Sequence, residues 1–290
     1  MTKHIALIGY ASGLGSADPG TQHGVQVLQK SEYLKELSSQ GLSFEWEGVV
    51  KPQQNSDSKL ELIAKECNEL ANHINNLVVA NKPFLVLGGD HSCAMGTWSG
   101  AAHAKHAEGD IGLIWFDAHM DSHTFETTPT RNIHGMPLAA LLGYGDRQLT
   151  SILNSHPKLK PENVCLLGTR SFEEGEAALL KKLNVRIFYM DEIQEKGFNK
   201  VFAEAIDIVS KNTIAYGLSI DLDGMDPTDA PGTGTSVPNG IHAKDLIHAL
   251  QSIAGDKRLI GTEIVEFDPH RDVDRKTEKL ICDLIATLFL

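Results

Sequence analysis

Eight short apolar segments recur along the chain, and longer stretches with helically spaced apolar residues separate most of them. Most of the eight are continuously apolar, which is typical of strands covered on both faces of a sheet. We predict strands at residues 4–9, 44–50, 84–88, 112–117, 163–168, 185–190, 214–221 and 259–266. Apolar residues three or four positions apart predict helices at residues 58–81, 173–183, 199–210 and 243–253, and a packed terminal helix at 284–290.

The alternation of strands with helices indicates an α/β fold with a doubly wound, mainly parallel sheet. No Pro/Ser-rich linker, low-complexity tract or internal repeat interrupts the pattern, so residues 1–290 are interpreted as a single domain. In sheets of this kind, ligands bind beyond the carboxyl ends of the strands. Candidate chemistry is therefore sought at those ends.

Composition narrows the class of protein. The 41% of hydrophobic residues excludes a wholly disordered chain, and 38 acidic against 26 basic residues argue against a nucleic-acid partner. No apolar run approaches the ~18–20 residues of a membrane helix, and the first residues lead directly into a strand without a signal-peptide pattern. The four cysteines are scattered and form no Cys-x-x-Cys pair, so they are expected to be buried thiols in a reducing, cytoplasmic setting.

Acidic residues and histidines follow four of the predicted strands. In chain order they are Asp90 and His91, then Asp117, His119 and Asp121, then Asp221 and Asp223, and finally Glu266. Because the carboxyl ends of parallel strands share one edge of a sheet, these side chains are expected to converge.

The spacing within two of these groups indicates a metal centre. Asp117, His119 and Asp121 are two positions apart, as are Asp221 and Asp223, so an extended backbone directs each group to one side. Converging carboxylates would repel one another unless cations were bound between them. An oxygen-rich set without thiolates suits a pair of manganese ions better than structural zinc. Asp90 is interpreted as an acceptor that fixes a loop.

At these positions the chain resembles the ureohydrolase family, which includes arginase, agmatinase and formiminoglutamase. The matching motifs are Gly88-Gly89-Asp90-His91-Ser92, Asp117-Ala118-His119-Met120-Asp121 and the run from Ser219 to Pro227, and the resemblance extends over nearly the whole chain. It implies a three-layer αβα fold with eight strands and a centre of two Mn²⁺ ions. The implied metal ligands are His91, Asp117, His119, Asp121, Asp221 and Asp223.

Within this family, the segment from Asn132 to Ala139 is most similar to arginase. That resemblance implies hydrolysis of L-arginine to L-ornithine and urea, in which a hydroxide bridging the metal ions attacks the guanidinium carbon. It also implies three catalytic residues: Asp121 passes a proton to the leaving amine, His134 exchanges protons with solvent, and Glu266 orients the guanidinium group. Histidine suits such exchange because its ordinary pKa lies near 6.5, and a carboxylate can accept two parallel hydrogen bonds from a guanidinium.

Several positions depart from the arginase pattern where the amino-acid end of the substrate would bind. His123 stands in place of an asparagine, Thr130 in place of a serine and Glu173 in place of an aspartate, whereas Thr235 fits the family. We take these four residues as candidate substrate contacts, and Arg131 as an exposed loop residue. The departures leave open agmatinase, formiminoglutamase or another guanidino-acid hydrolase. They also leave open a catalytically silent metal-binding scaffold and assembly as a homo-oligomer.

Overall fold

All eight predicted strands form and join one sheet in the computed structural model, which describes residues 3–53 and 57–290. The strand order is β2-β1-β3-β8-β7-β4-β5-β6, and all seven neighbouring pairs in this described part are parallel. The strands are β1 (Lys3–Tyr10), β2 (Leu42–Val50), β3 (Phe84–Leu87), β4 (Ile111–Phe116), β5 (Val164–Thr169), β6 (Arg186–Tyr189), β7 (Ala215–Asp221) and β8 (Leu259–Val265). The prediction of a doubly wound, mainly parallel sheet is confirmed.

The predicted helices also form, four of them within a few residues of their expected bounds, whereas the terminal helix begins eight residues before the predicted residue 284. They are α3 (Lys59–Val79), α7 (Glu174–Leu183), α9 (Phe198–Lys211), α10 (Ala243–Gln251) and the terminal α11 (Lys276–Phe289). The structure adds α4 (Ala94–Lys105) and five short helices: α1 (Gly24–Lys30), α2 (Glu32–Ser39), α5 (Pro137–Leu141), α6 (Arg147–Thr150) and α8 (Met190–Lys196). Three-residue 3₁₀ turns at His91–Cys93, Ile133–Gly135 and Leu222–Gly224 lie beside the strand ends.

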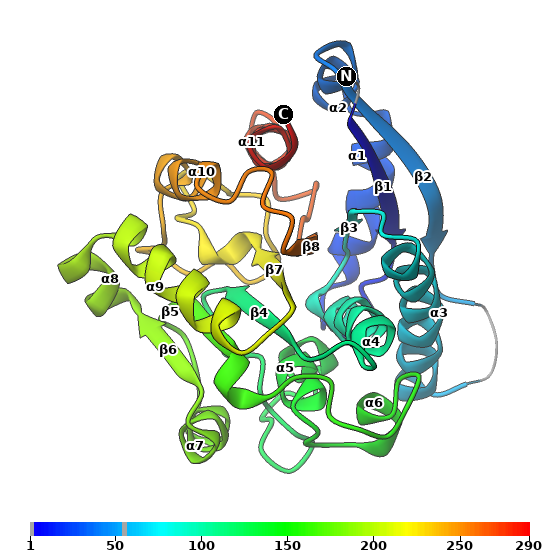
Figure 1. Ribbon diagram of the computed structural model, residues 1–290, viewed down its shortest axis with the longest axis vertical. Helices are drawn as coiled ribbons and strands as arrows, with labels where there is room; N and C mark the ends of the chain where they lie inside the picture. The colour runs from blue at the N-terminus through cyan, green and yellow to red at the C-terminus, as the bar shows by residue number, and fades with distance from the viewer. Residues whose placement is uncertain (1–2, 54–56) are drawn as a thin grey trace.

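Two hydrophobic clusters cover the two faces of the sheet, which gives three layers. Helices α1, α2, α8, α9, α10 and α11 pack on one face, and α3, α4, α5 and α7 pack on the other (Figure 1). The strands contribute to both layers in turn: Ile5 and Leu7 belong to one cluster, and Ala6 and Ile8 to the other. Within the described residues, no helix combines the length and apolarity needed to cross a membrane.

Close packing of α4 against α3 fixes the turn that follows β3. Helix α3 starts with a capping box, in which Ser58 and Glu61 satisfy each other's backbone N–H groups. Gly96 and Gly100 face this helix, where an added Cβ would lie 2.7 Å from the Cys67 carbonyl oxygen and 2.4 Å from that of Ala71. Only glycine allows this approach, which holds the start of α4, and the His91 turn before it, against α3.

The four central strands, in the order β3-β8-β7-β4, bring the polar strand ends together. His91 follows β3, Glu266 follows β8, Asp221 ends β7, and Asp117 follows β4. Since all four strands run in the same direction, these residues lie along one edge of the sheet.

Candidate metal centre

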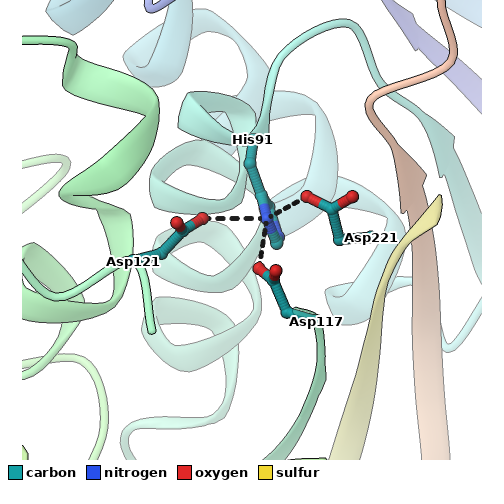
Figure 2. A group of neighbouring side chains, drawn as sticks. All are labelled: His91, Asp117, Asp121 and Asp221. Carbon is teal, nitrogen blue, oxygen red and sulfur yellow. Dashed lines mark ion pairs between the residues drawn. The ribbon is translucent and has the colours of Figure 1, made fainter. Parts of the chain in front are cut away.

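A buried histidine lies at the centre of three carboxylates (Figure 2). The Nδ1 atom of His91 is 3.2 Å from Asp117 Oδ2, 3.0 Å from Asp121 Oδ2 and 3.0 Å from Asp221 Oδ2. These four residues form a group that could hold a metal ion. We call them the first cluster.

A second cluster adjoins the first through a shared carboxylate. His119 Nδ1 is 3.1 Å from Asp223 Oδ2 and 3.4 Å from Asp117 Oδ1, so Asp117 presents one oxygen to each cluster. The backbone supports this arrangement, because the His119 N–H donates to Asp117 Oδ1 at 2.7 Å. All six residues predicted as metal ligands therefore lie in two adjoining groups.

The donor atoms of the first cluster fit a bound cation. His91 Nδ1 is buried among the three carboxylates, yet it has no hydrogen-bond partner among the described residues. A lone pair directed at carboxylates is repelled by them, whereas a cation between these groups would satisfy both. The chemistry of the donor set thus fits divalent metal ions.

The electrostatics of the clusters indicate the same need for positive charge. Burial and the neighbouring carboxylates Asp223 and Asp117 raise the pKa of Asp221 well above its ordinary value. Burial and Asp117 likewise raise the pKa of Asp121 to about 7. Burial opposes ionisation of Asp117 as well, but His119 and His91 hold its pKa well below the ordinary value. Bound cations would stabilise all of these carboxylates in their charged form.

Backbone strain occurs at two of the predicted catalytic residues. Asp121 has a φ of 46° and Glu266 a φ of 65°, both in the left-handed region that residues with a side chain rarely adopt. Such conformations cost about 1–3 kcal/mol and concentrate at functional sites. Here they turn one carboxylate toward the first cluster and the other toward His134.

Glu266 lies between the first cluster and the predicted proton-exchanging histidine. Its Oε1 accepts a hydrogen bond from the His91 N–H at 2.8 Å and lies 3.1 Å from His134 Nδ1. Burial raises the pKa of Glu266, but His134 outweighs that effect and holds the pKa below its ordinary value. Burial disfavours the charged form of His134, yet Glu266 raises the pKa of His134 to about 9.

The loop after β1 borders the same site. The Gly15 carbonyl accepts from the His134 N–H at 3.2 Å, and the Gly15 N–H donates to Asp90 Oδ2 at 2.8 Å. Asp90 also accepts from the Ser92 N–H at 2.9 Å. The interpretation of Asp90 as a loop-fixing acceptor is confirmed.

Two of the predicted substrate-binding residues meet at a third polar group. His123 Nε2 lies 3.0 Å from Glu173 Oε2 and 2.7 Å from Glu176 Oε2. The Glu173 side chain is 60% exposed, whereas that of Glu176 is 4% exposed. Burial lowers the pKa of His123, but the two carboxylates outweigh it and raise the pKa to about 9. Sequence reasoning missed Glu176, although its position three residues after Glu173, in the first turn of α7, signals that the two share a helix face.

The structure does not join the other predicted substrate contacts to these groups. Thr130 is exposed, and its hydroxyl oxygen accepts from the Asn132 N–H at 3.2 Å. Thr235 is also exposed. Arg131 is exposed, as expected, and lies over the Phe125 ring at 5.1 Å.

A supporting residue that sequence reasoning missed is Trp115. Its Nε1 donates to Asp117 Oδ2 at 2.9 Å, and its ring stacks on His91 with centroids 4.2 Å apart. The available signal was its position two residues before Asp117, at the end of β4, which predicts that both side chains lie on one side of the sheet.

Comparisons with known proteins agree over nearly the full length. The model of the arginase family matches residues 3–290. The arginase of Brevibacillus brevis is 38% identical over 296 aligned residues, which cover 100% of this chain and 98% of that protein. The solved arginase of Bacillus cereus superposes with a TM-score of 0.92 at 35% identity, covering 99% of this chain and 98% of that one. The formimidoylglutamase of Bacillus subtilis superposes with a TM-score of 0.82 at 26% identity, covering 99% and 86%.

Proposed function

The chain belongs to the arginase family, as its motifs predicted, and we propose that it is an arginase that hydrolyses L-arginine to L-ornithine and urea. The observation that carries this proposal is the contact of Glu266 with both the first cluster and His134. The similarity to arginases, which exceeds that to formimidoylglutamase in identity and TM-score, supports arginine over formiminoglutamate.

Two Mn²⁺ ions are the proposed cofactors. His91, Asp117, Asp121 and Asp221 would hold one ion, and Asp117, His119 and Asp223 the other. The predominance of carboxylate oxygens, with two imidazoles and no thiolate, favours Mn²⁺ over structural zinc. When bound, paired divalent ions lower the pKa of a water molecule, so that hydroxide is available near neutral pH.

Glu266 is proposed to orient the substrate. Its carboxylate is buried and charged, because the pKa of Glu266 lies below the ordinary value. A planar guanidinium can donate two parallel hydrogen bonds to such a group, which fixes the plane and the distance of the guanidinium carbon. The Gly89 carbonyl accepts from the Glu266 N–H at 2.8 Å and anchors this residue to the strand end beside the first cluster.

Two residues are proposed to move protons. Asp121 lies within the first cluster and would pass a proton to the departing amine of ornithine. His134 lies beside Glu266, is partly exposed, and would exchange protons with solvent. Its contact with Glu266 keeps a proton at Nδ1, because the neighbouring carboxylate raises the pKa of His134.

The group of His123, Glu173 and Glu176 is proposed to bind the amino-acid end of the substrate, and Thr130 and Thr235 are proposed contacts on the rim. The two carboxylates offer acceptors for an ammonium group. His123 already occupies both of them, so the substrate would share these acceptors with the imidazole.

A side-by-side substrate panel tests the proposal. Urea release from L-arginine, agmatine and 4-guanidinobutyrate is measured at equal concentration with manganese-loaded protein. We expect arginine to be turned over fastest. Turnover of agmatine without turnover of arginine would refute the proposal and indicate an agmatinase. Absence of turnover for every guanidino compound would indicate a catalytically silent metal-binding scaffold.

The setting of the enzyme is also proposed. All four cysteines are free and buried, which suits a reducing compartment, so we propose a cytoplasmic location. A single domain over residues 1–290 and assembly as a homo-oligomer stay predictions.

A further inference from the structure

The polar group at the start of α7 has the composition of a metal site of its own. His123 lies in the loop after β4, Glu173 is the N-cap residue of α7, and Glu176 lies in the first turn of that helix. One nitrogen or oxygen atom from each of the three side chains lies within 4.8 Å of the other two. We call these three residues the third cluster.

The third cluster has more acceptors than donors. A ring nitrogen such as His123 Nε2 carries at most one hydrogen, yet it lies 3.0 Å from Glu173 Oε2 and 2.7 Å from Glu176 Oε2. The other oxygen of Glu176, Oε1, is buried and has no hydrogen-bond partner among the residues that the structure describes. A buried acceptor without a partner is costly. A cation bound between the three side chains would satisfy the imidazole nitrogen and both carboxylates together.

The spacing of these atoms suits a transition-metal ion. Zn²⁺ binds imidazole nitrogen and carboxylate oxygen at about 2.0–2.2 Å, so neighbouring ligand atoms around one ion lie about 2.8–3.6 Å apart. The contacts of His123 lie at or just below the short end of this range, and those of His91 in the first cluster, at 3.0–3.2 Å, are similar. Imidazole suits Zn²⁺, and the affinity of such a site rises from Mn²⁺ to Zn²⁺, so the third cluster favours Zn²⁺.

Neighbouring contacts hold the third cluster in place. His123 Nδ1 lies 3.1 Å from Thr127 Oγ1, which leaves Nε2 directed at the two carboxylates. Helix α7 packs closely on the same loop, because a Cβ added at Gly175 would lie 2.7 Å from Thr127 Cβ. Ser122 Oγ also donates to the Glu176 carbonyl at 3.4 Å. The loop and the helix are thus fixed against each other, so the three ligands are in position before any ion binds.

We propose that His123, Glu173 and Glu176 form a third metal site, which binds one Zn²⁺ ion or a similar transition-metal ion in addition to the two ions of the metal centre. Binding of this ion depends on the three side chains alone. Its effect on catalysis rests on the proposed function, in which the same carboxylates accept the ammonium group of the substrate. The ion and that ammonium group therefore compete, which makes the third site inhibitory.

A count of bound ions tests the third site. Full-length protein is loaded with Mn²⁺ and then dialysed against Zn²⁺, and the sum of manganese and zinc per chain is measured by elemental analysis. Exchange of Zn²⁺ for Mn²⁺ within the first and second clusters leaves this sum unchanged. We expect wild-type protein to hold one ion more than His123→Asn, a variant that introduces the asparagine of the arginase pattern.

Two further variants make the count specific. His242→Asn removes an exposed imidazole that pairs with the single carboxylate of Asp229 at 3.0 Å, so it should hold as many ions as wild type. Glu173→Gln removes a ligand whose side chain is 60% exposed, so it should fold normally and hold one ion fewer. Equal sums in wild type, His123→Asn and Glu173→Gln would refute the third site and leave the metal centre in place. An equal loss in His242→Asn would refute it as well, because binding would then be unspecific.

Kinetics separate this inference from the proposed function. With L-arginine as substrate, Zn²⁺ at its dissociation constant for the third site should about double the KM of wild type relative to that of His123→Asn. A third ion that is counted but leaves KM unchanged would refute the inhibitory role. Protein that binds the third ion and hydrolyses no guanidino compound would refute the proposed function and leave the third site in place.

Discussion

Replacing Glu266 by glutamine removes one charge at the position that connects the first cluster with His134. The glutamine side chain has nearly the same shape, and its carbonyl oxygen could still accept from the His91 N–H, which Glu266 accepts at 2.8 Å. The substitution therefore keeps the local fold and removes the charge that would hold a guanidinium group.

The expected loss follows from the hydrogen bonds that change. Net hydrogen bonds to a charged group contribute about 1.5–3 kcal/mol, against about 0.5–1.5 kcal/mol for neutral pairs. A guanidinium would make two such bonds to Glu266, and an amide offers only one acceptor atom. Because the guanidinium keeps its charge, the variant loses one of these charged hydrogen bonds, about 1.5–3 kcal/mol or roughly 13- to 160-fold in kcat/KM.

Urea release from L-arginine at saturating Mn²⁺ gives kcat and KM for Glu266→Gln. The matched control is Asp268→Asn, which removes another buried carboxylate two residues further along, one that pairs with Arg271 and the His270 N–H. We expect the control to retain kcat/KM within about threefold. A loss below about threefold in Glu266→Gln would refute the assignment of Glu266 as the guanidinium anchor.

The same variant has a second consequence that needs no substrate. Glu266 is the group that raises the pKa of His134 to about 9 against the effect of burial. Removing its charge should lower the pKa of His134, which a pH titration of the labelled histidine by NMR would measure. An unchanged pKa would show that the contact of 3.1 Å between the two side chains is unimportant for the charge of His134.

Three further substitutions test separate parts of the structure. Asp223→Ala should reduce bound Mn²⁺ below two ions per chain and lower urea release, and unchanged metal content by elemental analysis would contradict its role in the second cluster. Glu173→Ala should raise KM for L-arginine several-fold with little change in kcat, whereas a kcat effect alone would show that Glu173 acts elsewhere. Burial raises the pKa of Glu66 to about 7, so the folded state binds a proton more tightly than the unfolded state. The free energy of unfolding should therefore fall as the pH rises from about 4.5 through 7. Glu66→Gln should remove that part of the decline, roughly 2 kcal/mol between pH 5 and pH 8 by urea unfolding, and parallel pH profiles for both proteins would contradict it.

The sequence predicted the sheet because its strands are buried on both faces. Segments such as residues 84–88 are continuously apolar, which leaves little choice of structure. The candidate ligands were predictable for a related reason. Asp117, His119 and Asp121 follow a strand, and parallel strands end at one edge. The expected extended backbone through these residues is wrong, because residues 117–121 lie beyond β4 and Asp121 has a φ of 46°.

Other features depend on contacts through space that no local pattern records. In the sequence, Glu263 only interrupts an apolar strand. Its burial is explained by the hydrogen bonds that it accepts from Trp98 and Ser219, which no local pattern predicts. The helical pattern alone predicts that Glu176 is exposed, whereas in the structure it is buried and contacts His123. The short helices α5 and α6, of five and four residues, are too short to show a helical period.

The central claim is that this chain needs two metal ions to hydrolyse arginine. Its most direct test is urea release from L-arginine as Mn²⁺ is added stepwise to chelator-treated protein. The account predicts negligible release without metal and full release when two ions per chain are bound. Release that survives complete removal of metal, or that stays absent at saturating Mn²⁺, would contradict it.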